Sequence, residues 1–136
     1  MDRMIFVNLP IRDMARSQAF FSSLGFGFNP QFTNEQGACM VIREDAIYAM
    51  LLVEPFFQTF TKKQVADARQ SAQVLICLSC SSRDEVDSLM AKALQGGATE
   101  PAEPKDHGFM YYRTFDDLDG HGWELMWMDP AASCPG

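Results

Sequence analysis

The sequence lacks both a surplus of positive charge and any long apolar run. Its 11 lysines and arginines are outnumbered by 18 aspartates and glutamates, which gives a formal net charge of −7. This balance argues against nucleic acid or an anionic membrane as a partner. No apolar stretch approaches the roughly 20 residues that span a bilayer. The opening MDRMIFVNLP has no small-residue cleavage site of the kind that follows a signal peptide, so we expect a cytoplasmic protein.

A second C-x-x-C motif is also missing. Cys77 and Cys80 form the single C-x-x-C among the four cysteines, a spacing that can hold zinc or form a redox pair. They lie in QVLICLSCS, a run typical of a strand, in which residues three apart point to opposite faces. We therefore expect reduced, buried thiols there in place of a zinc or redox site.

Two stretches of the chain repeat one order of elements. They are IFVNLPIRDMARSQAFFSSLGF from residue 5 and VLICLSCSSRDEVDSLMAKALQGG from residue 74. Each begins with a short apolar strand, continues through Arg-Asp and a Ser four residues after that Asp, and ends near Leu-Gly. The order of elements and the shared residues together favour a duplicated module.

The repeated stretches also carry the signals that begin and end helices. Asp13 is placed to cap the first helix, and Gly25 to end it. Ser82 and Glu85 form a capping box for the second helix, which the glycines at 96–97 can end. Apolar stripes at helical spacing follow each cap: Phe20, Phe21 and Leu24 in the first, and Val86, Leu89, Met90, Ala93 and Leu94 in the second.

Short strands are predicted after each helix. They fall at residues 27–32, 37–43 and 47–54 in the first half, and at 98–103, 109–115 and 122–128 in the second. We read a single α+β domain over residues 1–136, built of two βαβββ modules. Module one covers about 4–56, a connecting helix with a Thr61/Gln64 capping box about 57–72, module two about 73–130, and a flexible tail 131–136.

A βαβββ module leaves one face of its sheet uncovered by its helix. Two such modules, from one chain or from two, can curl into a cup made of curved mixed sheet. The inward face of that cup then becomes a ligand cavity. The sequence leaves open whether the cup closes within one chain or across two.

Two stretches of the chain resemble those of a known superfamily. The strand followed by RDMARSQAFFSSLGF resembles the opening of vicinal oxygen chelate proteins, which include glyoxalases, bleomycin resistance proteins and extradiol dioxygenases. The closing DLDGHGWEL is similar to that superfamily's Asp-Pro-Asp-Gly turn followed by a Glu. The resemblance covers about residues 4–130 and the duplicated order, and it implies the glyoxalase/bleomycin resistance/dihydroxybiphenyl dioxygenase-like fold.

The resemblance also indicates which residues would have to bind a metal. Metal-dependent members take four ligands from four inward strand positions, commonly His or Gln, Glu, His and Glu. The matching positions here are Phe6, Met50, Leu75 and Glu124, of which only the last carries a hard donor. One carboxylate does not hold a divalent metal usefully. We therefore expect no cofactor and no metal ligands, with Glu124 a ligand only if a metal site of another kind exists.

Strand parity predicts which side chains line the cup. Counting in twos from Glu124 and from the matching positions gives a mainly apolar, sulfur-rich lining, as in pockets for organic ligands. The predicted ligand-binding residues are Phe6, Asn8, Met50, Leu52, Leu75, Cys77, Ser79, Met110, Tyr112, Thr114 and Met126, with His107 reaching in from a loop.

Glu124 is the candidate catalytic residue, as a general base or as a carboxylate that pairs with a ligand. The alternative is an acid that is hydrogen-bonded to Tyr112 or Asn8 and has no chemistry. Parity separates Glu124 from His121, which we expect in an exposed turn, and puts Arg113 on the outer face. Asp116, Asp117 and Asp119 are interpreted as turn formers that use Asx hydrogen bonds.

Three functions compete. The first is a glyoxalase/bleomycin-resistance-like protein with a degenerate metal site, which binds a small organic molecule beside Glu124. The second is a lyase, isomerase or dioxygenase-type enzyme related to lactoylglutathione lyase, which uses Glu124 for acid–base work. The third is a non-catalytic interaction protein with a filled cup. The resemblance and an edge strand in each module imply a homodimer.

Overall fold

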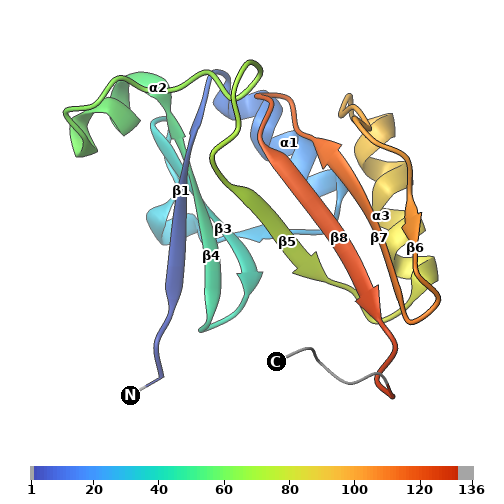
Figure 1. Cartoon of the computed structure of the whole chain (residues 1–136). Coiled ribbons are helices and arrows are strands. Elements are labelled where there is room, and N and C mark those ends of the chain that lie inside the picture. Colours follow the sequence, from blue (N-terminus) through green and yellow to red (C-terminus); the bar gives the residue numbers. More distant parts are fainter. Residues whose placement is uncertain (1, 132–136) are drawn as a thin grey trace. The chain divides into compact units, whose positions relative to one another are not determined.

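The structure of the protein is a computed structural model that describes residues 2–131. The chain divides into two compact units, Met1–Asp67 and Ala68–Gly136. Each unit has one four-stranded mixed sheet with a helix on one of its faces (Figure 1). Cys134 and all but the first residue of the predicted tail lie outside the described residues.

The first unit has the predicted βαβββ order, with strands arranged β1-β4-β3-β2. β1 runs parallel to β4, and the other neighbours are antiparallel. Its elements are β1 (Ile5–Ile11), α1 (Met14–Ser23), β2 (Gly27–Phe28), the 3-10 helix η1 (Pro30–Phe32), β3 (Gly37–Arg43) and β4 (Ile47–Val53).

Helix α1 begins and ends as the sequence predicts. The Asp13 carboxylate accepts a hydrogen bond from the backbone N–H of Arg16 at 3.1 Å, which satisfies a donor of the first turn. Gly25 follows the helix with φ of +103°, a conformation that glycine adopts without strain. Phe20 and Phe21 are buried and meet edge to face, so the helix covers its sheet with an aromatic stripe.

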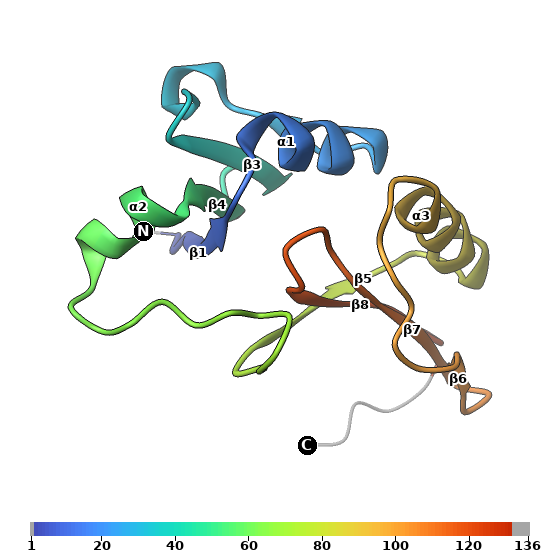
Figure 2. The ribbon, with the colours of Figure 1, turned by 90° about the horizontal axis from the view of Figure 1, so that it is seen from above.

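The second unit repeats the arrangement with strand order β5-β8-β7-β6. β5 runs parallel to β8, and β8, β7 and β6 are antiparallel in turn. Helix α3 lies along β7 and β8 (Figure 2). The elements are β5 (Leu75–Ser79), α3 (Arg83–Gln95), β6 (Lys105–Asp106), β7 (Met110–Asp116) and β8 (Gly122–Met128).

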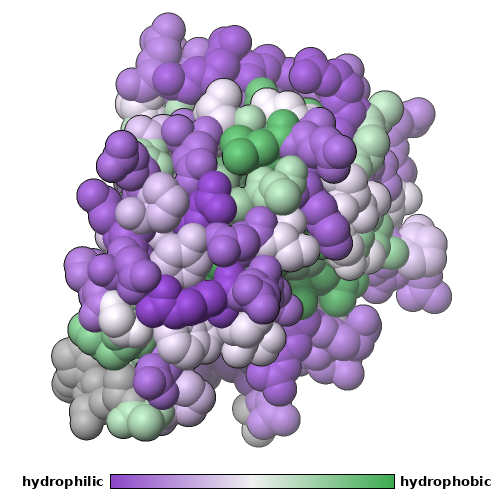
Figure 3. Space-filling model, turned by 90° about the vertical axis from the view of Figure 1, so that its right-hand side faces the viewer, coloured by the Kyte–Doolittle hydropathy of each residue, from purple (hydrophilic) through white to green (hydrophobic). Residues whose placement is uncertain are grey.

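Helix α3 has the predicted capping box in a slightly different form. The Ser82 hydroxyl accepts from the N–H of Glu85, while the Glu85 carboxylate accepts from the N–H of Ser81, one residue earlier than in the usual box. Val86, Met90 and Ala93 are fully buried under the helix. Leu94 is 40% exposed, so its prediction as part of the buried stripe is wrong. The side of the molecule that carries α3 and β6 is mostly hydrophilic (Figure 3).

The connecting segment differs from the prediction of a helix over about 57–72. A short helix α2 (Glu54–Phe57) and a 3-10 turn η2 (Gln58–Phe60) come earlier, since Pro55 suits a first helical turn. Residues 61–74, all of which are described, form no helix or strand. This polar stretch has too few apolar side chains to bury, and an isolated helix of that length is marginal in water.

Two strand predictions were also placed wrongly. The strand expected at 98–103 is only an isolated bridge between Thr99 and Asp116, and β6 lies later, at residues 105–106. Prolines at 101 and 104 lack the N–H that a ladder needs. In the first unit, the strand expected at 27–32 ends after Phe28 because Pro30 begins η1.

The element order and the two mixed sheets confirm the predicted α+β fold class. No helix within residues 2–131 is both long enough and apolar enough to cross a bilayer.

Candidate functional site

The candidate site is the face of the second sheet that points away from α3. Trp123 and Leu125 of β8 are 1% exposed, as is Phe115 of β7, because they pack on the helix side. Side chains alternate along a strand, so Glu124 and Met126 point to the opposite face, which we call the Glu124 face. It consists of Leu75, Cys77, Ser79, Met110, Tyr112, Thr114, Asp116, Gly122, Glu124, Met126 and Met128.

Strand register orders the Glu124 face into rows. In the central row Glu124 lies between Cys77 of β5 and Thr114 of β7. On one side of it comes the row of Ser79, Met126 and Tyr112, and on the other the row of Leu75, Gly122 and Asp116. The structure therefore brings the predicted site residues of the second module onto one surface.

Glu124 is partly exposed, and its carboxylate has no hydrogen-bond or ion-pair partner within residues 2–131. Neither of the predicted alternatives, a bond to Tyr112 or to Asn8, is present there. The carboxylate does act on Cys77, whose pKa is raised by burial and by the nearby charge of Glu124. A thiol that holds its proton is a weak nucleophile and a weak metal ligand. Cys77 is also exposed, contrary to the prediction of a buried thiol.

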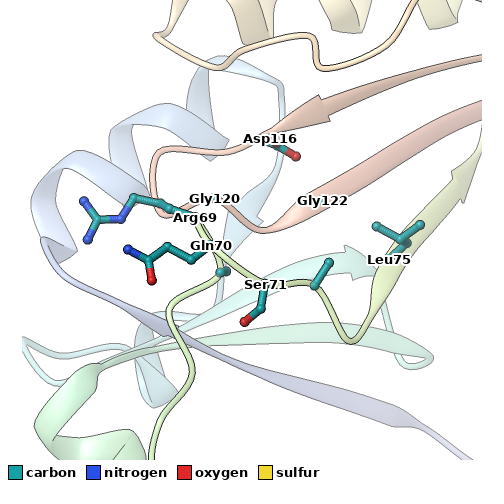
Figure 4. Close-up of a pocket in the computed structure, with 9 residues that line it drawn as sticks. Arg69, Gln70, Ser71, Leu75, Asp116, Gly120 and Gly122 are labelled. Atoms are coloured by element: carbon teal, nitrogen blue, oxygen red, sulfur yellow. The ribbon is translucent and has the colours of Figure 1, made fainter.

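A small pocket adjoins the row of Leu75, Gly122 and Asp116. It has a volume of about 180 Å³ and is open to solvent. Residues 68–72 form one wall, and Gly120, Gly122 and Asp116 complete it (Figure 4). Asp116 is the last residue of β7 and not a turn former, and burial raises its pKa. Strand alternation predicts this placement on the Glu124 face, because Asp116 lies two residues after Thr114 on the same strand.

Asp117 closes the β7–β8 connection, as the Asx interpretation predicts. One carboxylate oxygen accepts the backbone N–H groups of Asp119 and His121, both at 2.9 Å. The other accepts the indole N–H of the buried Trp123 at 2.9 Å. His121 is half-buried in this turn and not exposed as predicted. Its backbone N–H stabilises the turn, and the residue does not belong to the Glu124 face.

His107 lies at the margin of the Glu124 face. Its ring is 6.3 Å from the ring of Tyr112, centroid to centroid. The backbone around it is held by Arg83, whose guanidinium binds both carboxylate oxygens of Asp106, at 2.7 and 3.0 Å, and the carbonyl of Gly108 at 2.9 Å. This clamp lowers the pKa of Asp106 to about 2.

Arg113 lies on the outer face, as parity predicts. Its guanidinium binds both carboxylate oxygens of Glu100, at 2.9 and 3.0 Å, and one oxygen of Asp87 at 3.0 Å. The Tyr111 hydroxyl donates to the same Asp87. These contacts tie β7 to α3 and to the segment before β6, so their role is structural.

The predicted site residues of the first module share one face of the first sheet. Phe6 stacks on Tyr48 at 4.9 Å, and Asn8 and Met50 are direct neighbours in the next row. Leu52 differs from the prediction because it is only 3% exposed. A side chain at Gly37 would meet both Leu52 and Phe56, which shows that α2 covers this end of the face. The cup that would join both sets of residues stays a prediction.

The donors on the Glu124 face do not suit a divalent metal. No group of three or more His, Cys, Asp or Glu side chains converges within residues 2–131. Phe6, Met50 and Leu75 stand at the matching ligand positions, and the neighbours of Glu124 are a protonated thiol and a hydroxyl. A single carboxylate with such neighbours is a poor site by the rules of hard-cation coordination.

Comparison with known proteins supports the fold from two directions. A profile of the family described as bleomycin resistance protein-like N-terminal matches residues 3–42. Comparison with curated protein sequences finds no match. Among solved structures, hypothetical protein SA1046 from S. aureus is similar, with 26% identity and a TM-score of 0.77 over 93% of this chain and 95% of that one.

Two further structures are similar in fold. A glyoxalase/bleomycin resistance protein/dioxygenase family enzyme from Burkholderia phytofirmans PsJN has 16% identity and a TM-score of 0.74, over 90% of this chain and 96% of that one. The fosfomycin resistance protein FosX from Listeria monocytogenes, complexed with Mn(II) and sulfate, has 16% identity and a TM-score of 0.68, over 96% and 93%. With its two βαβββ units, the chain shares the fold of these glyoxalase/bleomycin resistance/dioxygenase structures, and its first 42 residues include the segment that matches the bleomycin resistance protein-like family.

Proposed function

We propose that the protein binds a small organic molecule on the Glu124 face and does so without the metal site of its metal-dependent relatives. The observation that carries the proposal is the unpaired Glu124 carboxylate in the middle of a sulfur-rich surface that also carries a few polar side chains. A polar group fixes the orientation of a ligand, and the surrounding apolar side chains supply most of the contact area.

Methionine supports this function on physical grounds. Met110, Met126 and Met128 lie on the Glu124 face, each only partly buried. Flexible thioether side chains adapt to ligands of varied shape and make favourable contacts with aromatic rings. Tyr112 and the nearby His107 ring add flat surfaces at the same margin. We therefore expect aromatic or other flat, apolar ligands.

The test is NMR of protein labelled at the methionine methyl groups, titrated with small neutral and cationic aromatics at millimolar concentration. Binding on the Glu124 face shifts the methyl signals of Met126, Met110 and Met128. Met40 and Met90 are internal controls because they are fully buried in the two cores. Equal shifts at the control methyls, or none at Met126, would refute the proposal.

The Glu124→Gln variant tests the role of the carboxylate. It keeps the size of the side chain and one acceptor oxygen, while it replaces the other oxygen by an NH₂ donor and removes the charge. We expect ligands with a donor or a positive charge to lose about fivefold or more in affinity, which is the size of a partly exposed charged hydrogen bond. Binding that is unchanged for every ligand would assign Glu124 no role.

The homodimer that the resemblance implies belongs to the same proposal. The edge strands β1 and β5 carry exposed apolar side chains, with Ile5 55% and Leu75 60% exposed. We expect sedimentation velocity to give twice the chain mass of 15.3 kDa at micromolar concentration. A monomer at those concentrations would contradict this part of the proposal.

A further inference from the structure

The two modules differ most at one row of their sheets. Phe6 stands seven residues before the N-cap Asp13, and Leu75 stands seven residues before the N-cap Ser82, so the two positions are equivalent. In the first module the row is filled, because Phe6 lies beside Tyr48 and their rings stack. In the second module the residue beside Leu75 is Gly122. The second module has no ring in this row, and the Leu75 side chain lies against the backbone of Gly122.

Gly122 has no side chain, and this lets Leu75 lie close to the backbone beside a carboxylate. A side chain at this position would place its first carbon 2.7 Å from Leu75 Cδ2 and 3.7 Å from a carboxylate oxygen of Asp116. Asp116 is directly opposite Gly122 in the register of β7 and β8. The pocket of about 180 Å³ is therefore a cradle between Leu75 and the Asp116 side chain (Figure 4).

The Asp116 carboxylate has no cationic partner among the described residues. It makes no side-chain hydrogen bond or ion pair there, and burial is what raises its pKa. Arg69 also lines the pocket, but its side chain extends away from Asp116 in Figure 4. Glu124 lies on the neighbouring strand, diagonal to Asp116 on the same face. Diagonal neighbours of this kind are roughly 7–8 Å apart, so the two negative charges reinforce each other at the pocket.

We propose that this pocket binds the ammonium group of a protonated organic amine, which donates to Asp116 while the apolar part of the ligand lies over the Glu124 face. An ammonium offers hydrogen-bond donors and a positive charge, which are what a partly desolvated, unpartnered carboxylate requires. The pocket volume suits a compact head group and not a whole drug-sized molecule, whose sites are about 300 Å³ or larger. This inference rests on the proposed ligand-binding function of the same face.

A matched pair of probes tests it: 2-phenylethylamine, protonated at neutral pH, and the neutral 2-phenylethanol. Binding is followed by the backbone amide signal of Gly122, which reports on the pocket, and by the methyl signal of Met126, which reports on the Glu124 face. We expect the amine to bind at least about fivefold more tightly than the alcohol. Equal affinities, or no binding of either probe at millimolar concentration, would overturn the inference.

Two variants locate the ammonium. Asp116→Asn is expected to weaken the amine about fivefold or more and to leave the alcohol within about twofold. Gly122→Ala fills the cradle and is expected to weaken the amine as well. It should fold because the contacted Leu75 side chain is 60% exposed and can move. Glu103→Gln, an exposed acid away from the pocket, removes the same charge and is expected to change nothing.

The outcomes separate the two proposals. Amine binding that shifts Met126 but is indifferent to Asp116→Asn would leave the proposed function standing and overturn the ammonium pocket. Amine binding that depends on Asp116 but neither shifts Met126 nor responds to Glu124→Gln would support the contact between the ammonium and Asp116. It would overturn the proposed function, in which Glu124 and the methionines contact the ligand, and with it the placement of the ligand's apolar part. A loss in the Glu103→Gln control equal to that in Asp116→Asn would reduce the effect to net charge and overturn the pocket.

Discussion

Asp117 provides the strongest single test of how the second module is held together. Its carboxylate is 7% exposed and accepts three N–H groups, those of Asp119, His121 and the Trp123 indole, all at 2.9 Å. Two of these donors are buried, and a buried donor without an acceptor costs roughly 1–3 kcal/mol. The third, at His121, is partly buried and costs about 1 kcal/mol. We therefore expect Asp117→Ala to lower the free energy of unfolding by about 3–7 kcal/mol.

Asp117→Asn separates the turn from the indole contact. The amide oxygen still accepts the two backbone N–H groups, but the amide NH₂ then faces the indole N–H of Trp123, donor against donor. The expected loss is about 1–3 kcal/mol, less than for alanine. Adding Trp123→Phe removes the opposing donor, so the two changes together should cost about 1 kcal/mol less than the sum of each alone.

Urea unfolding followed by far-ultraviolet circular dichroism measures these values. At roughly 2–4 °C per kcal/mol, the alanine variant should also melt about 6–28 °C lower. Asp116→Asn is the matched control, because the neighbouring carboxylate has no bonded partner in residues 2–131, and it should stay within about 0.5 kcal/mol of the parent. An Asp117→Ala loss below about 1 kcal/mol, or an Asn variant as unstable as the Ala variant, would refute the reasoning.

Four further predictions concern Gly120, Gly108, the Arg83–Asp106 pair and Cys77. Gly120→Ala should lower the free energy of unfolding by more than about 2 kcal/mol, because φ is +91° and the added carbon would lie 2.6 Å from the backbone nitrogen of Arg69. Gly108→Ala, with φ of +82° and nothing within 4 Å, should cost only about 1 kcal/mol. The pKa of Asp106 is about 2, below its ordinary value of 3.8. The ionised carboxylate therefore stabilises the fold fully above pH 3.8, and this stabilisation is lost as the pH falls towards 2. Arg83→Met should raise the pKa measured by NMR towards 3.8 and reduce this acid sensitivity, with the N–H of Gly108 still lowering the pKa; an unchanged pKa would contradict the clamp. Cys77 should react slowly with iodoacetamide at pH 8 despite its exposure, and faster in Glu124→Gln, as followed by mass spectrometry of the peptide; equal rates would show that the carboxylate does not reach the thiol.

Much of each module could be predicted because its signals are local. Asp13 and Ser82 cap the two helices where expected, since a capping side chain needs only donors two or three residues away. Strand parity placed Glu124 and Trp123 on opposite faces, because alternation depends only on the strand being extended. Asp117 formed its Asx turn for the same local reason.

The features that the sequence did not predict depend on contacts between distant residues. Strand β6 lies at 105–106, where Asp106 meets Arg83 from the start of α3, 23 residues away. The pocket exists because the backbone of residues 68–72 crosses close to Gly120, where a side-chain carbon would lie 2.6 Å from a backbone nitrogen. Neither the spacing of apolar residues nor a capping residue predicts that two distant segments cross. Asp116 was therefore assigned to the turn, although parity with Thr114 carried the correct placement.

The duplicated architecture makes the divergence of the two modules informative. At the equivalent central rows, the first sheet has Asn8 beside Met50, and the second has Cys77 beside Glu124. One row further, the stacked rings of Phe6 and Tyr48 correspond to Leu75 and Gly122. Filling a sheet face with aromatic contacts stabilises a module, whereas an unpaired carboxylate beside an open pocket offers no such gain. Because both modules build the same sheet, the fold does not demand the arrangement of the second module. Its two carboxylates and its missing ring are what the proposed ligand binding would require.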